Sequence, residues 1–156
     1  MNVFLDEACT QAEVLETCLK NYFEKDNKVL DEIKNLYYEK GFNRILFAGI
    51  GSSYYAPYCV SGMLSRKGIP SSVFNAFDLS RNNFEQVTSD TLLVCISQSG
   101  KSWEVVELAN KAKGVTTVVG IFNKEGSPLS EIVDYSLLIY AGDEWNISNK
   151  TYLCTQ

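Results

Sequence analysis

An apolar run at residues 92–96 leads directly into a turn that is rich in hydroxyl side chains. Five consecutive apolar residues, β-branched ones among them, predict a strand that is buried on both faces, as in a parallel sheet. The turn carries Ser97, Gln98, Ser99 and Ser102, and the pattern that follows predicts a helix packed on that sheet. A strand, a polar turn and a helix in this order are typical of an α/β fold.

The helix start after this turn predicts an anion site. The first N–H groups of a helix have no partner within it and carry partial positive charge, so phosphate is the anion that we expect. Serine is also a common N-terminal cap, and Ser99 or Ser102 alone would be explained by capping. Three hydroxyls and one amide within six residues exceed what a cap requires, which favours a ligand.

The same order recurs along the chain. Strands are predicted at 44–48, 71–74, 92–96, 116–122 and 135–140, and helices at 54–67 and from 103 to about 113. One or two helical turns are expected at 129–133, and the polar segment 78–83 is expected to be irregular. Two amphipathic helices, at about 5–23 and from 29 to Gly41, precede the first strand. The fold class is therefore α/β, with a doubly wound, five-stranded parallel sheet flanked by helices and two N-terminal helices.

A second polar turn follows the first predicted strand. It contains Gly49, Gly51, Ser52 and Ser53. The carboxyl ends of parallel strands lie at one edge of the sheet, where ligands bind close to the point at which the strand order reverses. We therefore expect the two turns to converge on one ligand.

Two nucleotide-binding motifs match this chain only in part. A dinucleotide fingerprint would need a third glycine where Tyr54 stands and an acidic residue where Asn75 stands. A nucleotide phosphate loop ending at Ser102 would need a leading glycine where Cys95 stands. The sequence therefore favours neither nucleotide-binding motif.

Composition excludes several classes of function. Nineteen acidic residues against 14 basic ones, without a basic block, argue against nucleic acid as a partner. Without an apolar run of 18 residues or a secretory signal, we expect no membrane association and a cytoplasmic location. Five cysteines form no Cys-x-x-Cys pair and there is no histidine, so we expect no disulfide framework, no metal site and no cofactor.

The polar turns resemble those of the sugar isomerase (SIS) domain family. The resemblance rests on Gly51-Ser52-Ser53-Tyr54, Ser97-Gln98-Ser99-Gly100 and, after the last strand, Ala141-Gly142-Asp143-Glu144 and Ser148-Asn149-Lys150. More narrowly, the chain is similar to the first of two such domains in glucosamine-6-phosphate synthase and the fructosamine-phosphate deglycases. This implies a flavodoxin-like strand order, a helical leader at 1–43 and an SIS phosphosugar-binding domain at 44–156.

The resemblance also implies which residues hold the sugar phosphate. The phosphosugar-binding set carried over to this chain is Gly51, Ser52, Ser53, Ser97, Gln98, Ser99 and Ser102. Hydroxyls and N–H groups can bind a phosphate dianion without a fixed cation. Lys101 replaces a usual acidic residue; it either adds attraction for the phosphate or is a solvated lysine, and we favour the solvated lysine. Glu144 could be catalytic, but we favour a structural carboxylate that ties its loop to nearby N–H groups.

In this family the catalytic acid–base residues lie in a second SIS domain and a neighbouring subunit, so no catalytic residue is assigned in this chain. The resemblance implies the N-terminal half of an aldose/ketose isomerase or a deglycase, inactive alone. Its ligand would be a hexose 6-phosphate or an amino-sugar derivative. The alternative is a non-catalytic phosphosugar sensor. In either case we expect a homodimer or pairing with a second SIS domain.

Overall fold

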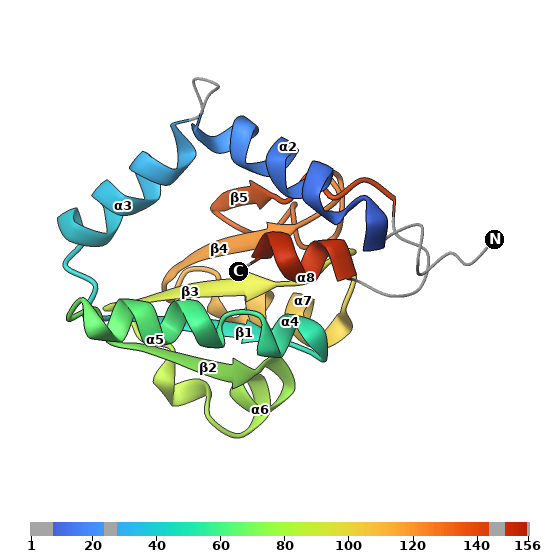
Figure 1. Ribbon diagram of the computed structural model, residues 1–156. Helices are drawn as coiled ribbons and strands as arrows, with labels where there is room; N and C mark the ends of the chain where they lie inside the picture. The colour runs from blue at the N-terminus through green and yellow to red at the C-terminus, as the bar shows by residue number, and fades with distance from the viewer. Residues whose placement is uncertain (1–7, 24–27, 144–148, 156) are drawn as a thin grey trace.

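The computed structural model describes residues 8–23, 28–143 and 149–155, and its centre is a five-stranded sheet (Figure 1). All neighbouring strands pair in parallel. Their order across the sheet is β2 (Ser71–Asn75), β1 (Arg44–Gly49), β3 (Thr91–Ile96), β4 (Thr117–Phe122) and β5 (Tyr135–Leu138). The predicted doubly wound parallel sheet and its flavodoxin-like order are confirmed.

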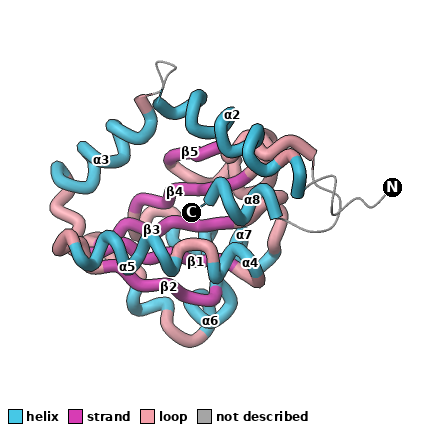
Figure 2. Tube along the Cα trace, in the orientation of Figure 1, coloured by secondary structure: helices cyan, strands magenta, loops and turns pink. Residues whose placement is uncertain are grey.

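Helices cover both faces of the sheet (Figure 2). On one face, α3 (Val29–Glu39) and α5 (Tyr58–Arg66) pack against a cluster that includes Phe47, Val94 and Ile96. On the other face, α6 (Ala76–Arg81) and α7 (Trp103–Ala112) enclose the larger cluster. Successive strand side chains point to opposite faces, so a strand between two helical layers must be apolar at nearly every position.

Two terminal helices pack together beside β5. The first, α2 (Gln11–Phe23), contacts α8 (Asn149–Thr155), and the Tyr22 hydroxyl donates a 2.7 Å hydrogen bond to the Leu138 carbonyl. Both N-terminal helices expected from the sequence are therefore present within the described residues. None of the described helices is long and apolar enough to cross a membrane.

The single helix predicted over 54–67 is two helices. A short helix, α4 (Ser52–Tyr55), begins earlier than expected, and α5 starts after Pro57. The Ala56 N–H still donates to the Ser52 carbonyl, but Pro57 has no N–H with which to continue this ladder. The helix is therefore interrupted at Pro57. Helix α5 begins after it, with the Ser61 N–H donating to the Pro57 carbonyl at 2.8 Å.

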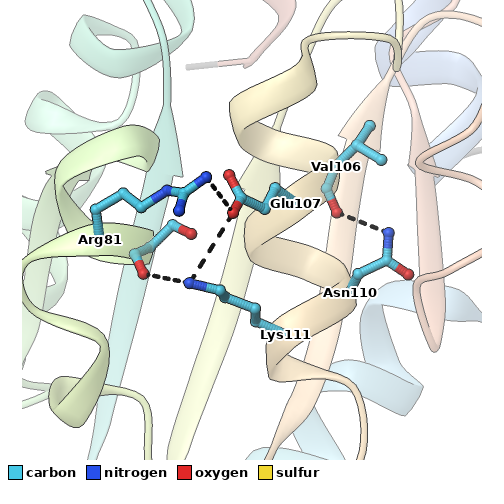
Figure 3. Close-up of polar contacts among 6 residues, drawn as sticks. Arg81, Val106, Glu107, Asn110 and Lys111 are labelled. Atoms are coloured by element: carbon cyan, nitrogen blue, oxygen red, sulfur yellow. Dashed lines mark hydrogen bonds and ion pairs between the residues drawn. The ribbon is translucent and has the colours of Figure 1, made fainter.

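The prediction of an irregular segment at 78–83 is wrong, because residues 76–81 form α6. The Asn75 side chain caps this helix by accepting the Phe77 N–H at 3.0 Å, and Ala76 and Leu79 are completely buried. Figure 3 shows how α6 docks on α7: Arg81 pairs with the Glu107 carboxylate at 2.8 Å. Tertiary packing of two apolar side chains therefore outweighs the polar local sequence.

The segment 129–133, predicted as one or two helical turns, forms hydrogen-bonded turns without becoming a helix. Its Leu129 carbonyl accepts from the Ile132 N–H at 3.1 Å. Leu129 itself is completely buried. This segment therefore packs into the core before the chain enters β5.

Candidate functional site

The two polar turns predicted from the sequence leave the sheet side by side. Strands β1 and β3 are neighbours, and their pairing places Ala48 beside Cys95, immediately before the two turns. From β1 the chain crosses outward to β2 through α4 and α5, whereas from β3 it crosses to β4 through α7 on the opposite face. The strand order thus reverses between these two turns, where open α/β sheets form a crevice for ligands.

The first turn folds back closely on its own strand. Gly51 has a positive φ of 58°, a conformation that glycine adopts readily. A Cβ atom on Gly49 would lie 2.5 Å from the Ser53 carbonyl oxygen, so only glycine allows this approach. The turn places an exposed Ser52 and a half-buried Ser53 at the start of α4.

The second turn gathers its hydroxyls. Ser97 is almost completely buried, and its Oγ is hydrogen-bonded to the Ser102 Oγ at 3.0 Å. The Ser99 Oγ accepts the Lys101 N–H at 3.2 Å. Among the described residues, the Ser102 hydroxyl caps no N–H group of α7. The first turn of α7 therefore keeps N–H groups that a bound anion could use, while the Ser97–Ser102 pair lies beside them.

The loop after β4 fixes the second turn. The Asn123 N–H donates to the Gln98 carbonyl and the Leu129 N–H donates to the Gly100 carbonyl, both at 3.0 Å. Gly100 has a φ of +64°, and a Cβ atom there would lie 2.2 Å from the Ser127 Oγ. The turn therefore depends on glycine both for its backbone conformation and for its contact with the neighbouring loop.

Asn123 also joins a third segment to the site, and sequence analysis did not select it. Its Nδ2 donates to the Gly142 carbonyl at 2.6 Å, and its Oδ1 accepts the Ala141 N–H at 2.8 Å. The buried Lys150 then donates to the Asp143 carbonyl at 2.9 Å. An amide residue directly after a strand, at the same edge as the serine turns, was the signal that could have identified it.

Charge at this edge comes from outside the seven predicted residues, which carry only hydroxyl, amide and backbone groups. Lys101 is exposed, as expected of a solvated lysine. Burial raises the pKa of the Cys95 thiol to about 12, so this thiol beneath the turn stays protonated and unreactive at neutral pH. Glu144 and Ser148 lie outside the described residues.

The seven predicted residues offer donors for an anion, and none of the seven carries a carboxylate, imidazole or amine. Serine hydroxyls and backbone N–H groups are donors for phosphate oxygens, but their pKa values are too high for proton transfer near neutral pH without an activating base. The described residues contain no group of three His, Cys, Asp or Glu that could hold a metal ion. The binding roles of Gly51, Ser52, Ser53, Ser97, Gln98, Ser99 and Ser102 stay predictions.

Comparison with protein families gives a match over most of the chain. The model of the family described as "SIS domain" matches residues 38–155. Two curated relatives are glutamine–fructose-6-phosphate aminotransferases (isomerizing). The one from Pyrococcus horikoshii is 36% identical over 116 residues, which cover 71% of this chain and 19% of the relative. The one from Bartonella quintana is 30% identical over 151 residues, which cover 95% and 25%.

Solved structures share the fold. The C-terminal domain of glucosamine-fructose-6-phosphate aminotransferase from Francisella tularensis superposes with a TM-score of 0.83 and 25% identity, covering 98% of this chain and 44% of that one. The Vibrio vulnificus NanR protein complexed with ManNAc-6P has a TM-score of 0.72 and 21% identity, covering 95% and 58%. The chain spans about a fifth to a quarter of the length of the curated relatives described above.

Proposed function

We propose that the carboxyl edge of the sheet binds the phosphate group of a sugar phosphate, because the chain belongs to the SIS domain family. The observation that carries this proposal is the buried Ser97 hydroxyl, paired with the Ser102 hydroxyl at 3.0 Å at the point where the strand order reverses. In this proposal the phosphate lies between the turn after β1 and the turn after β3. It takes hydrogen bonds from Ser53, Ser97, Gln98, Ser99 and Ser102, with Gly51 and Ser52 beside them.

The chemistry of this edge suits a phosphate dianion. Hydrogen bonds to an ionised acceptor are roughly twice as strong as bonds between neutral groups, so several hydroxyl and N–H donors together replace a fixed cation. The positive end of α7 adds to this attraction. Because the loop after β4 fixes the Gln98 and Gly100 carbonyls, the donors of the turn are held in place before a ligand arrives.

The ligand class follows from the relatives. The glutamine–fructose-6-phosphate aminotransferases act on a hexose 6-phosphate by name, and the similar fold of NanR has been solved with ManNAc-6P. We therefore propose a hexose 6-phosphate or an amino-sugar derivative as the ligand. The whole protein would be an aldose/ketose isomerase or a deglycase, in which this chain binds the sugar phosphate and another domain supplies the acid–base groups.

Three further features belong to this proposal. Residues 1–43 form a helical leader and residues 44–156 form the ligand-binding domain. The protein is cytoplasmic, in line with five cysteines that are widely separated in sequence and form no Cys-x-x-Cys pair. It pairs with a second copy of itself or with a second SIS domain.

A thermal-shift titration tests the proposal. The chain is titrated with fructose 6-phosphate, glucose 6-phosphate, glucosamine 6-phosphate and inorganic phosphate. A ligand that binds only the folded state stabilises it by about 2.7 kcal/mol at a concentration of 100 Kd. For a domain of this size, this corresponds to a rise in the unfolding midpoint of roughly 5–10 °C. We expect such a rise with at least one sugar phosphate.

Two double variants make the titration specific. Ser97→Ala with Ser99→Ala should abolish the rise because both hydroxyls belong to the predicted site. The matched control, Ser72→Ala with Ser136→Ala, replaces two exposed serines on edge strands of the same sheet and should keep the rise. No rise with any sugar phosphate, or an equal rise in both double variants, would contradict the proposal.

A further inference from the structure

Two cysteines that are far apart in sequence meet where α2 contacts α8. Cys18 lies on α2 and Cys154 lies on α8, and the two helices pack against each other beside β5 (Figure 1). The Cys154 thiol donates a hydrogen bond to the Cys18 sulfur. Both sulfurs are thiols in the structure. The fold therefore brings together two side chains that could be oxidised as a pair.

Each of these cysteines lies one helical turn from a residue that anchors its helix. Tyr22, four residues after Cys18, donates its hydroxyl to a carbonyl of β5 at 2.7 Å. Lys150, four residues before Cys154, donates to the Asp143 carbonyl, just after β5, at 2.9 Å. Residues four apart lie on the same face of a helix. Both anchors therefore hold the cysteine-bearing faces of α2 and α8 at the same end of β5.

Both thiols line one hollow between α2, β5 and α8. Its volume is about 310 Å³, and its other walls are mainly apolar, with Leu19 and Leu137 among them. Cys18 is only 6% exposed, whereas Cys154 is half-buried. A water molecule takes up about 30 Å³ of the liquid, so the hollow has room for a reagent as small as hydrogen peroxide.

Cys18 differs from the other buried cysteine, Cys95. The hydrogen bond from Cys154 holds the pKa of the Cys18 thiol below its ordinary value, although burial acts in the opposite direction. At Cys95, burial acts alone and raises the pKa to about 12. The thiolate is the form that oxidants attack, and redox-sensing cysteines commonly have a second cysteine beside them. Cys18 therefore has the environment of the reactive cysteine and Cys154 the position of its partner.

We propose that Cys18 and Cys154 are a redox-sensitive pair, which hydrogen peroxide joins in a disulfide that fastens α8 to α2. A metal ion would need more ligands, and the described residues contain no group of three His, Cys, Asp or Glu that could hold one. Disulfides inside cells are mostly transient or redox-sensing, so a reversible bond is compatible with a reducing compartment. This inference does not depend on the sugar-phosphate proposal.

The reaction needs one molecule of peroxide and proceeds in two steps. The Cys18 thiolate attacks one peroxide oxygen, the O–O bond breaks, and hydroxide leaves while Cys18 becomes a sulfenic acid. The Cys154 sulfur then attacks the Cys18 sulfur, the S–O bond breaks, and the thiol proton leaves with the oxygen as water. The proton first lost by Cys18 neutralises the hydroxide. Two thiols are thus oxidised by two electrons, and the peroxide is reduced to two molecules of water.

The disulfide would also act on the segment beside the candidate site. Lys150 on α8 is bonded to the Asp143 carbonyl, and the Asn123 side chain holds the two residues before Asp143. A covalent link between α8 and α2 would therefore restrain the segment that follows β5. It would also close a loop from residue 18 to residue 154, and long loops of this kind give a disulfide its largest effect on stability.

Counting thiols before and after oxidation tests the proposal on the 156-residue chain. The chain is treated with a small excess of hydrogen peroxide, the peroxide is removed with catalase, and the thiols are labelled with N-ethylmaleimide in urea. The reduced chain should take up five labels, one for each cysteine, and the oxidised chain three. Peptide mapping should find Cys18 linked to Cys154 at the mass of a single chain. The thermal midpoint should rise by about 5–15 °C, and dithiothreitol should reverse both changes.

Three variants identify the pair. Neither Cys18→Ala nor Cys154→Ser should lose two thiols together or gain the rise in midpoint, and the half-buried Cys154 can be replaced with little effect on folding. The matched control replaces the two exposed cysteines, Cys9→Ser with Cys59→Ser, and should keep the full rise. A wild-type chain that still takes up five labels after peroxide would overturn the proposal. A disulfide that joins other cysteines or two chains, or a rise that persists in Cys154→Ser, would also overturn it.

Discussion

Replacing Gly100 with alanine should destabilise the protein through two separate effects at the turn after β3. The backbone of Gly100 has a φ of +64°, which side chains with a Cβ adopt at a cost of about 1–2 kcal/mol. In addition, the new methyl group would lie 2.2 Å from the Ser127 Oγ and 2.6 Å from the Ser127 Cβ. Relieving such an overlap in a packed region costs about 1–3 kcal/mol. The free energy of unfolding should therefore fall by about 2–5 kcal/mol.

Gly126→Ala is the matched control. Gly126 has a φ of +66°, but no described atom lies within 4 Å of its Cβ position. It should lose only the conformational part, about 1–2 kcal/mol. Urea denaturation followed by circular dichroism measures both losses, and an unchanged m-value confirms that the midpoints can be compared. The difference between the two variants, about 1–3 kcal/mol, then reports the contact with Ser127 alone.

Ser127→Gly in the Gly100→Ala background tests the cause directly. Removing the Ser127 side chain should recover the part of the loss that arises from overlap, so the two substitutions should be coupled by at least about 1 kcal/mol in a double-mutant cycle. Equal losses in Gly100→Ala and Gly126→Ala, together with no coupling to Ser127, would refute the close packing of the two loops.

Two other substitutions test the site and its surroundings. Asn123→Ala removes the acceptor of the buried Ala141 N–H and the donor to the Gly142 carbonyl, so the free energy of unfolding in urea should fall by about 1–3 kcal/mol, and by less in Asn123→Asp, which keeps the acceptor. Burial raises the pKa of the Cys95 thiol from 9.0 to about 12. The thiol therefore ionises at a lower pH in the unfolded chain than in the folded protein. The free energy of unfolding should fall as pH rises above 9, by at most about 1.4 kcal/mol per pH unit. In urea titrations between about pH 8 and 10 the Cys95→Ala variant should lack this slope, and an identical slope in both proteins would contradict it.

Local pattern was enough to predict the sheet. The apolar runs now seen as β1, β3 and β4 are each flanked by glycine and hydroxyl residues, and such runs form buried strands whatever their neighbours are. The serine turns after β1 and β3 were visible for the same reason, because a turn directly follows its strand. The sequence therefore indicated the fold class and the edge at which the candidate site lies.

Local pattern failed where distant residues decide the structure. The polar sequence of α6 folds as a helix because Leu79 is buried between α6, α7 and the sheet. The break at Pro57 was missed because the helix starts two residues earlier than the apolar pattern suggests.

Only the tertiary structure shows what each polar side chain meets. The Ser97 hydroxyl pairs with Ser102, and Asn123 joins the loop after β4 to the segment after β5. The same is true of α5, since Val60 and Met63 are both apolar in sequence, but Val60 packs against the core whereas Met63 is exposed. Strand and turn propensities act between neighbours in the chain, whereas hydrogen-bond partners and exposed faces depend on packing between segments that are far apart in sequence.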